Sequence, residues 1–178
     1  MIIYFVRHAS AGERVANLKK DEKRPLDADG IQQCGYVGRA LAAANVQPDV
    51  IISSPFKRAT QTASLIGNEI GYEGKLQLDP AMQPAATFAD FQRMLEKYAR
   101  HEAIMVVGHN PSITDFFARI ITKSGSAALV EFKKGAVACT ETQRQAARLK
   151  WFMTPKLAHA IQAAAAAAEK SHAKTSRK

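Results

Sequence analysis

Two arginines and two histidines are the side chains of this sequence best suited to chemistry on a phosphoryl group. They are Arg7 and His8 in RHA, Arg58 in SSPFKRATQTA, and His109 in VVGHN. An arginine presents a planar fork of donors that fits phosphate oxygens, and a neutral imidazole can attack phosphorus and carry the phosphoryl group. A second histidine can donate hydrogen bonds to the group in transfer. The residue types therefore predict a phosphate site.

Apolar stretches precede all of these residues and predict the elements that position them. Residues 2–6 (IIYFV), 49–52 (DVII) and 103–107 (AIMVV) are expected to form buried strands. Helices are expected over 30–44, from Ser54-Pro55 to about Gly71, over 88–100 and over 112–122. This alternation predicts an α/β fold, a three-layer αβα sandwich whose central sheet is mostly parallel, with helices on both faces.

The carboxyl ends of parallel strands meet at one edge of a sheet, where such folds bind ligands. We therefore expect Arg7, His8, Arg58 and His109 to converge there. Each residue alone has a structural explanation: an Arg-His pair is common, His109 could satisfy a loop backbone, and Arg58 could lie on a helix surface. Their shared position at strand ends favours the phosphate site.

The remaining elements are predicted from shorter patterns. A short strand is expected at 75–78, two strands near 127–132 and 136–140 joined through residues 133–135, and a final strand at 147–153. Residues 19–24 read as a solvated mixed-charge loop, with a place at the rim of the site as the alternative. A domain over 1–158 is expected, followed at 159–178 by an alanine-rich helix and a basic, disordered tail.

Composition limits the classes of protein. The 178 residues are 47% hydrophobic and 23% charged, which is typical of one globular domain, and no apolar run reaches the length that spans a membrane. The net charge of +9 favours anionic ligands, or serves solubility alone. Cys34 and Cys139 form no CxxC pair, and the N-terminal run lacks the features of a signal peptide. Two reduced thiols and a cytoplasmic location are expected, with no membrane partner.

Three segments resemble the signature blocks of the histidine phosphatase superfamily, the phosphoglycerate mutase-like proteins. They are Arg7-His8-Ala9 after an apolar strand, residues 53–63, and residues 106–110, and their order and spacing agree with the family. The short chain, and Arg24-Pro25-Leu26 followed by Gly30, resemble the small phosphohistidine phosphatases of the SixA type. Residues 149–156 are similar to the ends of that subgroup.

The resemblance implies roles for these residues. His8 becomes the phosphorylated nucleophile, while Arg7, Arg58 and His109 bind the phosphate, together with Asn110. It implies no cofactor and no metal, because guanidinium groups supply the positive charge. The implied partner is a phosphohistidine-containing protein of a phosphorelay, with nucleic acid not expected. His8 has to be neutral to attack, and two neighbouring guanidinium groups should lower its pKa.

The sequence departs from the family pattern in two places. Ala9 replaces the usual glycine. The added methyl group is small, and we expect the site to tolerate it. Ala81 stands where larger members carry a glutamate as general acid, and Asp79, Asp90 and Glu13 are alternatives without particular support. A missing acid matters most for a poor leaving group such as an alkoxide, so the gap favours a phosphoramidate substrate.

Two further functions stay open from the sequence. One is a phosphatase or mutase acting on a small phosphoester. The other is a non-enzymatic module that binds phosphoanions, with the basic tail contacting nucleic acid or polyphosphate. The oligomeric state is not predicted.

Overall fold

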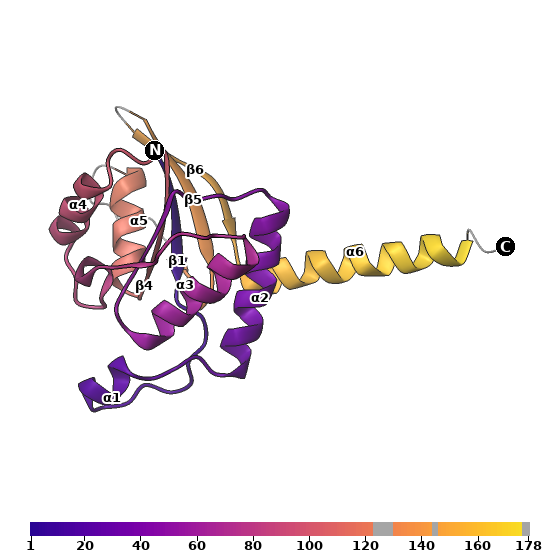
Figure 1. The fold of residues 1–178 in the computed structure, drawn as a ribbon, viewed down its shortest axis with the longest axis horizontal. Coiled ribbons are helices and arrows are strands. Elements are labelled where there is room, and N and C mark those ends of the chain that lie inside the picture. The colour runs from indigo at the N-terminus through magenta and orange to yellow at the C-terminus, as the bar shows by residue number, and fades with distance from the viewer. Residues whose placement is uncertain (123–129, 144–145, 176–178) are drawn as a thin grey trace.

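A six-stranded mixed sheet forms the centre of the molecule in the computed structural model (Figure 1). The structure describes residues 1–122, 130–143 and 146–175. The strands are β1 (Ile2–Arg7), β2 (Val50–Ser53), β3 (Gln77–Leu78), β4 (Ala103–Gly108), β5 (Val137–Gln143) and β6 (Ala146–Met153). Their order in the sheet is β3-β2-β4-β1-β5-β6. The first four strands pair in parallel, whereas β5 is antiparallel to both β1 and β6.

Helices cover both faces of this sheet, as the sequence predicts. They are α1 (Leu18–Glu22), α2 (Ala28–Ala43), α3 (Lys57–Glu69), the 3-10 turn η1 (Pro80–Met82), α4 (Phe88–Lys97), α5 (Ser112–Thr122) and α6 (Pro155–Thr175). Side chains of α2, α3 and the start of α6 pack on one face, and those of α4 and α5 pack on the other. The α/β fold with helices on both faces of a mostly parallel sheet is confirmed.

The first strand is buried on both faces, which explains its continuous apolar sequence. Ile3 and Phe5 point into the core beneath α4 and α5, while Tyr4 and Val6 point into the core beneath α2 and α3. Successive strand residues face opposite sides, so a central strand between two helix layers needs apolar residues throughout. This packing fixes the register of β1 and hence the position of His8 at its end.

The predicted hairpin through residues 133–135 is wrong. Part of the predicted strand near 127–132 lies outside the described residues, and 130–132 carry no strand. Instead β5 pairs with β1 and β6, and Gly135, at φ +74, donates its N–H to the carbonyls of Arg7 and His8. Residues 130–135 therefore form a loop beside the end of β1. The predicted solvated loop at 19–24 also needs correction, since the short helix α1 covers most of it.

The C-terminal helix starts at Pro155 and projects from the body of the molecule (Figure 1). Its first turns contact α2, where Gln162 donates to the Tyr36 carbonyl at 2.7 Å and His159 lies 4.2 Å from the Tyr36 ring. The alanines from 163 to 168 are exposed. The predicted division at residue 158 stays a prediction, and the last three residues lie outside the described part.

Both cysteines are free and buried in the structure. Among the described residues, no helix combines the length and the apolar character that crossing a membrane requires.

Candidate active site

Three neighbouring parallel strands bring the predicted residues to one edge of the sheet. β1 ends at Arg7 and delivers His8, β4 ends at Gly108 and delivers His109, and β2 leads through Ser54 into α3, which carries Arg58. The strand ends are tied together by hydrogen bonds from the His8 N–H to the Gly108 carbonyl and from the Ser54 N–H to the Val107 carbonyl, both 2.9 Å. Sheet pairing alone therefore sets the spacing of the two histidines.

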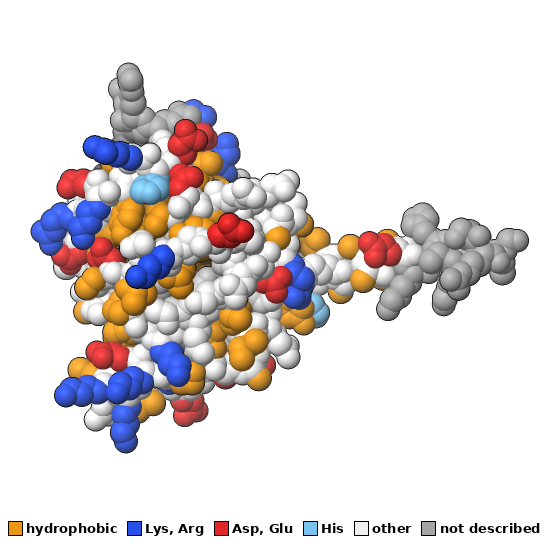
Figure 2. Space-filling model, viewed as in Figure 1, with side chains coloured by type: hydrophobic (Ala, Val, Ile, Leu, Met, Phe, Trp, Pro, Cys, Tyr) orange, Lys and Arg blue, Asp and Glu red, His pale blue; other side chains and the backbone are white. Residues whose placement is uncertain are grey.

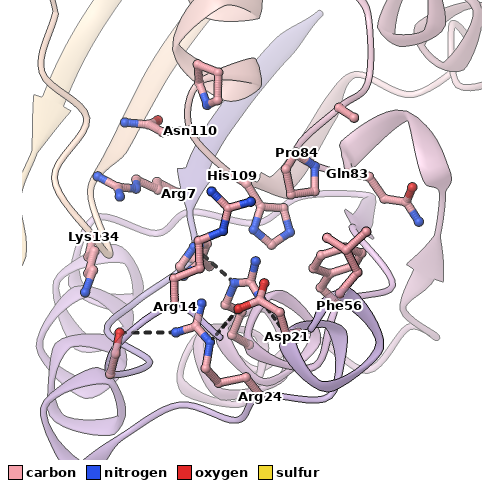
Figure 3. Close-up of a pocket in the computed structure, with 16 residues that line it drawn as sticks. Arg7, Arg14, Asp21, Arg24, Phe56, Gln83, Pro84, His109, Asn110 and Lys134 are labelled. Carbon is pink, nitrogen blue, oxygen red and sulfur yellow. Dashed lines mark hydrogen bonds and ion pairs between the residues drawn. The ribbon is translucent and has the colours of Figure 1, made fainter. Parts of the chain in front are cut away.

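All five predicted site residues line one cavity of about 610 Å³ (Figure 3). The His8 and His109 rings lie 4.8 Å apart, and Nε of Arg58 lies 3.4 Å from Nε2 of His8. In Figure 3, Arg7 and Asn110 flank one side of His109, while Phe56 and Gln83 flank the other. The structure thus brings together the five residues expected to attack or bind the phosphate.

His8 is buried and held as a neutral base. Its Nδ1 lies 2.8 Å from the Ala9 carbonyl, which can only accept, so Nδ1 carries the hydrogen and Nε2 keeps its lone pair. Burial is the largest cause that lowers the pKa of His8 to about 3; the charges of Arg58, Arg7 and Arg24 act in the same direction, and the hydrogen bond to the Ala9 carbonyl opposes them. The direction is the predicted one, but burial contributes more than the guanidinium charges. Nε2 is therefore unprotonated at neutral pH and accepts a hydrogen bond from Nε of Arg58 at 3.4 Å, and its lone pair can act as a nucleophile.

His109 faces His8 across the site and is also kept neutral. Burial lowers its pKa to about 2, assisted by His8 and by nearby arginine charges. Its Nε2 lies 2.9 Å from the Ser54 hydroxyl, and the Phe56 ring packs against it at 5.1 Å. If Ser54 donates to Nε2, then Nδ1 carries the remaining hydrogen. That Nδ1 is buried and has no hydrogen-bond partner.

Arg58 is fixed by the short helix α1. Its Nη1 donates to the Asp21 carbonyl at 2.8 Å and pairs with the Asp21 carboxylate at 3.2 Å. Asp21 also accepts from Nε of Arg24 at 2.9 Å, and Arg24 donates to the carbonyls of Ala11 and Gly12. Burial alone would raise the pKa of Asp21, but its hydrogen bonds and the arginine charges lower it overall. This network holds the guanidinium beside His8.

Arg7 and Asn110 share one anchor on the loop that precedes β5. Nη1 of Arg7 donates to the Phe132 carbonyl at 2.6 Å, and the Asn110 amide donates to the same oxygen at 3.2 Å. The side-chain oxygen Oδ1 of Asn110 accepts from the Thr114 hydroxyl at 2.8 Å. Nε of Arg7 is buried without a partner. The loop therefore orients both side chains while leaving one guanidinium donor unsatisfied.

Several residues that line or support the cavity were not predicted from the sequence. Asp21 and Arg24 lie in the segment 19–24, for which a place at the rim of the site was only the alternative to a solvated loop, although Arg24-Pro25 belonged to the family pattern. Four more wall residues were not singled out: Arg14, Gln83, Pro84 and Lys134. Their positions depend on loops, for which apolar periodicity gives no information.

The described wall of the cavity carries one carboxylate, Asp21, which already pairs with Arg24 and Arg58. Ala81 is buried in η1, and the nearby wall consists of Gln83, Pro84 and Ala85. The other candidates for the general acid do not line the cavity either. Asp79 pairs with Lys97 at 3.2 Å, Asp90 caps α4 through Thr87, and Glu13 is exposed. Within the described residues, none of the proposed acids is therefore placed to protonate a leaving group in this cavity.

Comparison with known proteins gives one family and a consistent set of folds. The sequence profile of the histidine phosphatase superfamily (branch 1) matches residues 3–84. Phosphohistidine phosphatase SixA of Escherichia coli is 22% identical over 115 residues, which is 64% of this chain and 70% of that protein.

Two solved structures show the same fold. A protein histidine phosphatase SixA complexed with tungstate superposes with a TM-score of 0.77 at 21% identity, covering 87% of this chain and 97% of the other. A protein assigned as SixA of Agrobacterium tumefaciens superposes with a TM-score of 0.74 at 25% identity, covering 86% and 97%.

Proposed function

This chain belongs to branch 1 of the histidine phosphatase superfamily, and from that premise we propose that it hydrolyses phosphohistidine through a phosphoenzyme formed at His8. The proposed substrate is a phosphorelay protein that carries the phosphoryl group on a histidine. Arg7, Arg58, His109 and Asn110 are the proposed phosphate-binding residues.

Two buried nitrogens without a hydrogen-bond partner carry this proposal, and both are donors in the tautomer in which Ser54 donates to Nε2 of His109. Within the described residues, the buried side-chain nitrogens and oxygens that lack a hydrogen-bond partner are Nε of Arg7 and Nδ1 of His109. An unpaired buried donor costs about 1–3 kcal/mol, so folded proteins rarely keep one without a reason. Both belong to residues that line the cavity with the neutral Nε2 of His8. A bound phosphoryl group supplies the acceptor oxygens that these donors lack.

The proposed reaction proceeds in two displacements. The Nε2 lone pair of His8 forms a bond to phosphorus while the P–N bond of the substrate breaks, and the released imidazole takes a proton from water. Water then attacks the phosphoryl group on His8, the His8 P–N bond breaks, and phosphate leaves. The net change is phosphohistidine plus water to histidine plus phosphate. Arg7, Arg58 and His109 stabilise the charge on the transferring oxygens.

The absence of a placed acid on the described wall supports a phosphoramidate substrate. An alkoxide leaving group needs a proton in the transition state, whereas an imidazole leaves readily and is protonated by solvent. The tungstate complex of SixA supports the binding step, because tungstate is a tetrahedral oxyanion of the same shape as phosphate. The absence of a cofactor or metal and the cytoplasmic location stay expectations from the sequence.

Relative turnover of two substrate classes tests the proposed function. We expect kcat/KM for a histidine-phosphorylated phosphorelay domain to exceed that for ribose 5-phosphate by at least about 100-fold, the difference that one effective general acid makes. His8→Asn should abolish turnover, whereas His159→Asn, at an exposed residue of α6 that does not line the cavity, should preserve it. A preference for the sugar phosphate would support the phosphoester alternative, and binding of phosphate without any turnover would support the non-enzymatic one.

A further inference from the structure

We propose that the exposed face of residues 14–23, at the mouth of the cavity, is a docking surface for a protein whose phosphorylated residue lies in an acidic surface. The proposal rests on the proposed function and adds how the substrate is recognised. We call residues 14–23 the rim segment.

The rim segment carries an excess of exposed positive charge. Its exposed cations are Arg14, Lys19, Lys20 and Lys23, against the single exposed acid Glu22. None of these four cations takes part in a salt bridge within the described residues. Figure 2 shows Lys and Arg side chains gathered over the region of α1 at the lower left of the molecule. Unpaired charge of one sign beside a cavity raises the local concentration of a partner of the opposite sign.

Apolar side chains accompany this charge. Leu18 is 71% exposed, the largest exposed fraction among the large hydrophobic residues described, and it also lines the cavity. Val15 is 37% exposed in the same segment. Interfaces between proteins combine an apolar centre with a charged rim. A nucleic acid backbone gains little from a leucine, so this combination favours a protein partner.

The rim segment is linked to the proposed nucleophile through Arg58. Asp21, on the buried side of α1, pairs with Arg58, whose Nε lies 3.4 Å from Nε2 of His8. Arg24 ties the end of the segment to the carbonyls of Ala11 and Gly12. Docking on the outer face of α1 therefore places the partner on the element whose buried side chain, Asp21, holds Arg58 beside His8. The segment is also anchored before the partner arrives, which lowers the entropy cost of binding.

Charge reversal of the three outer lysines tests the proposal. The variant Lys19→Glu/Lys20→Glu/Lys23→Glu leaves the cavity wall unchanged. Two probes are compared at low ionic strength, because exposed charges are screened over about 10 Å at 0.1 M salt. They are phosphoramidate ion and a phosphorelay domain that is phosphorylated on histidine and has an acidic surface. We expect kcat/KM for the phosphorylated domain to fall at least about tenfold, as for loss of electrostatic steering, with phosphoramidate turnover within about twofold of wild type.

A matched control separates docking from total charge. Lys75→Glu/Arg100→Glu/Lys156→Glu changes the net charge equally, at exposed cations away from the cavity. We expect this variant to retain most of its turnover of the phosphorylated domain. Equal losses in both variants, or no loss in the rim variant, would overturn the docking surface.

The docking proposal and the proposed function fail in different ways. If wild type hydrolyses neither probe, the proposed function fails. If it hydrolyses both probes while the three lysines affect only the binding of a DNA duplex, the function stands and the rim segment is not a protein docking site.

Discussion

The neutral state of His8 depends on its surroundings at the scale of single residues. Burial lowers the pKa of His8 to about 3 and that of His109 to about 2, in both cases with burial as the largest cause. Arg7 and Arg58 can therefore lie close to the two rings, because neither ring carries a competing positive charge at neutral pH. The site offers positive charge to an anion and a free lone pair to phosphorus.

This charge state predicts the acid limb of the pH profile. An imidazole is lost as a base when pH falls below its pKa, so His8 should stay active well below pH 6.5. Between pH 6.5 and 5 we expect kcat/KM for p-nitrophenyl phosphate, corrected for ionisation of the substrate, to change less than about twofold. An imidazole with the ordinary pKa of 6.5 would lose about 16-fold in its neutral form between pH 6.5 and pH 5. A loss of that size in folded enzyme would contradict the assignment.

Asp21 is the residue on which the position of Arg58 depends. We expect Asp21→Asn to lower the free energy of unfolding by about 3 kcal/mol, because it leaves two arginines without their buried partner. We also expect kcat/KM to fall at least about tenfold through misplacement of Arg58.

Asp115→Asn is the matched control for Asp21→Asn, since it removes an exposed pair with Arg119 in α5. This variant should lower the free energy of unfolding by less than about 1 kcal/mol and leave activity intact. Chemical denaturation and initial rates, measured well below the melting temperature, check both variants. Full activity in Asp21→Asn would show that Arg58 does not need this anchor.

At the scale of elements, apolar periodicity predicted the strands and helices that pack in the core. It did not predict the short helix α1 or the loop at 130–135. The strands that end before His8 and His109 were predictable because burial on both faces demands continuous apolar residues. α1 was not, since its five residues LKKDE show the charges of a solvated loop and its single buried side chain is Asp21. The loop at 130–135 contacts Arg7 and Asn110 through a backbone carbonyl, and a backbone atom leaves no trace in residue types.

Two glycines of α2 should respond in opposite ways to alanine. A Cβ at Gly30 would lie 2.0 Å from the Ser10 carbonyl oxygen, in the loop that follows His8. We expect Gly30→Ala to destabilise the fold by at least about 1–3 kcal/mol, since backbone must move. A Cβ at Gly35 would meet only the flexible end of the Arg39 side chain. We therefore expect Gly35→Ala to raise the free energy of unfolding by about 0.5–1 kcal/mol. Equal melting temperatures for the two variants would show that α2 does not press on this loop.

At the scale of the whole molecule, the body and the end of α6 are expected to be independent. The contacts of α6 with α2 involve its first turns, at His159 and Gln162, whereas residues 163–169 are exposed. We expect deletion of 164–178 to shift the melting temperature by less than about 2 °C, equivalent to under about 1 kcal/mol, and to preserve kcat/KM. Insoluble protein or lost activity after this deletion would assign the helix end a part in the fold or the site.

The most direct test of the account is to trap the phosphoenzyme and map its phosphate. Enzyme quenched in base during turnover of a phosphorylated substrate should carry acid-labile, base-stable phosphate on His8, with none on His109 and none in His8→Asn. Phosphate on any other residue, or turnover without a labelled enzyme, would contradict a mechanism in which His8 is the nucleophile.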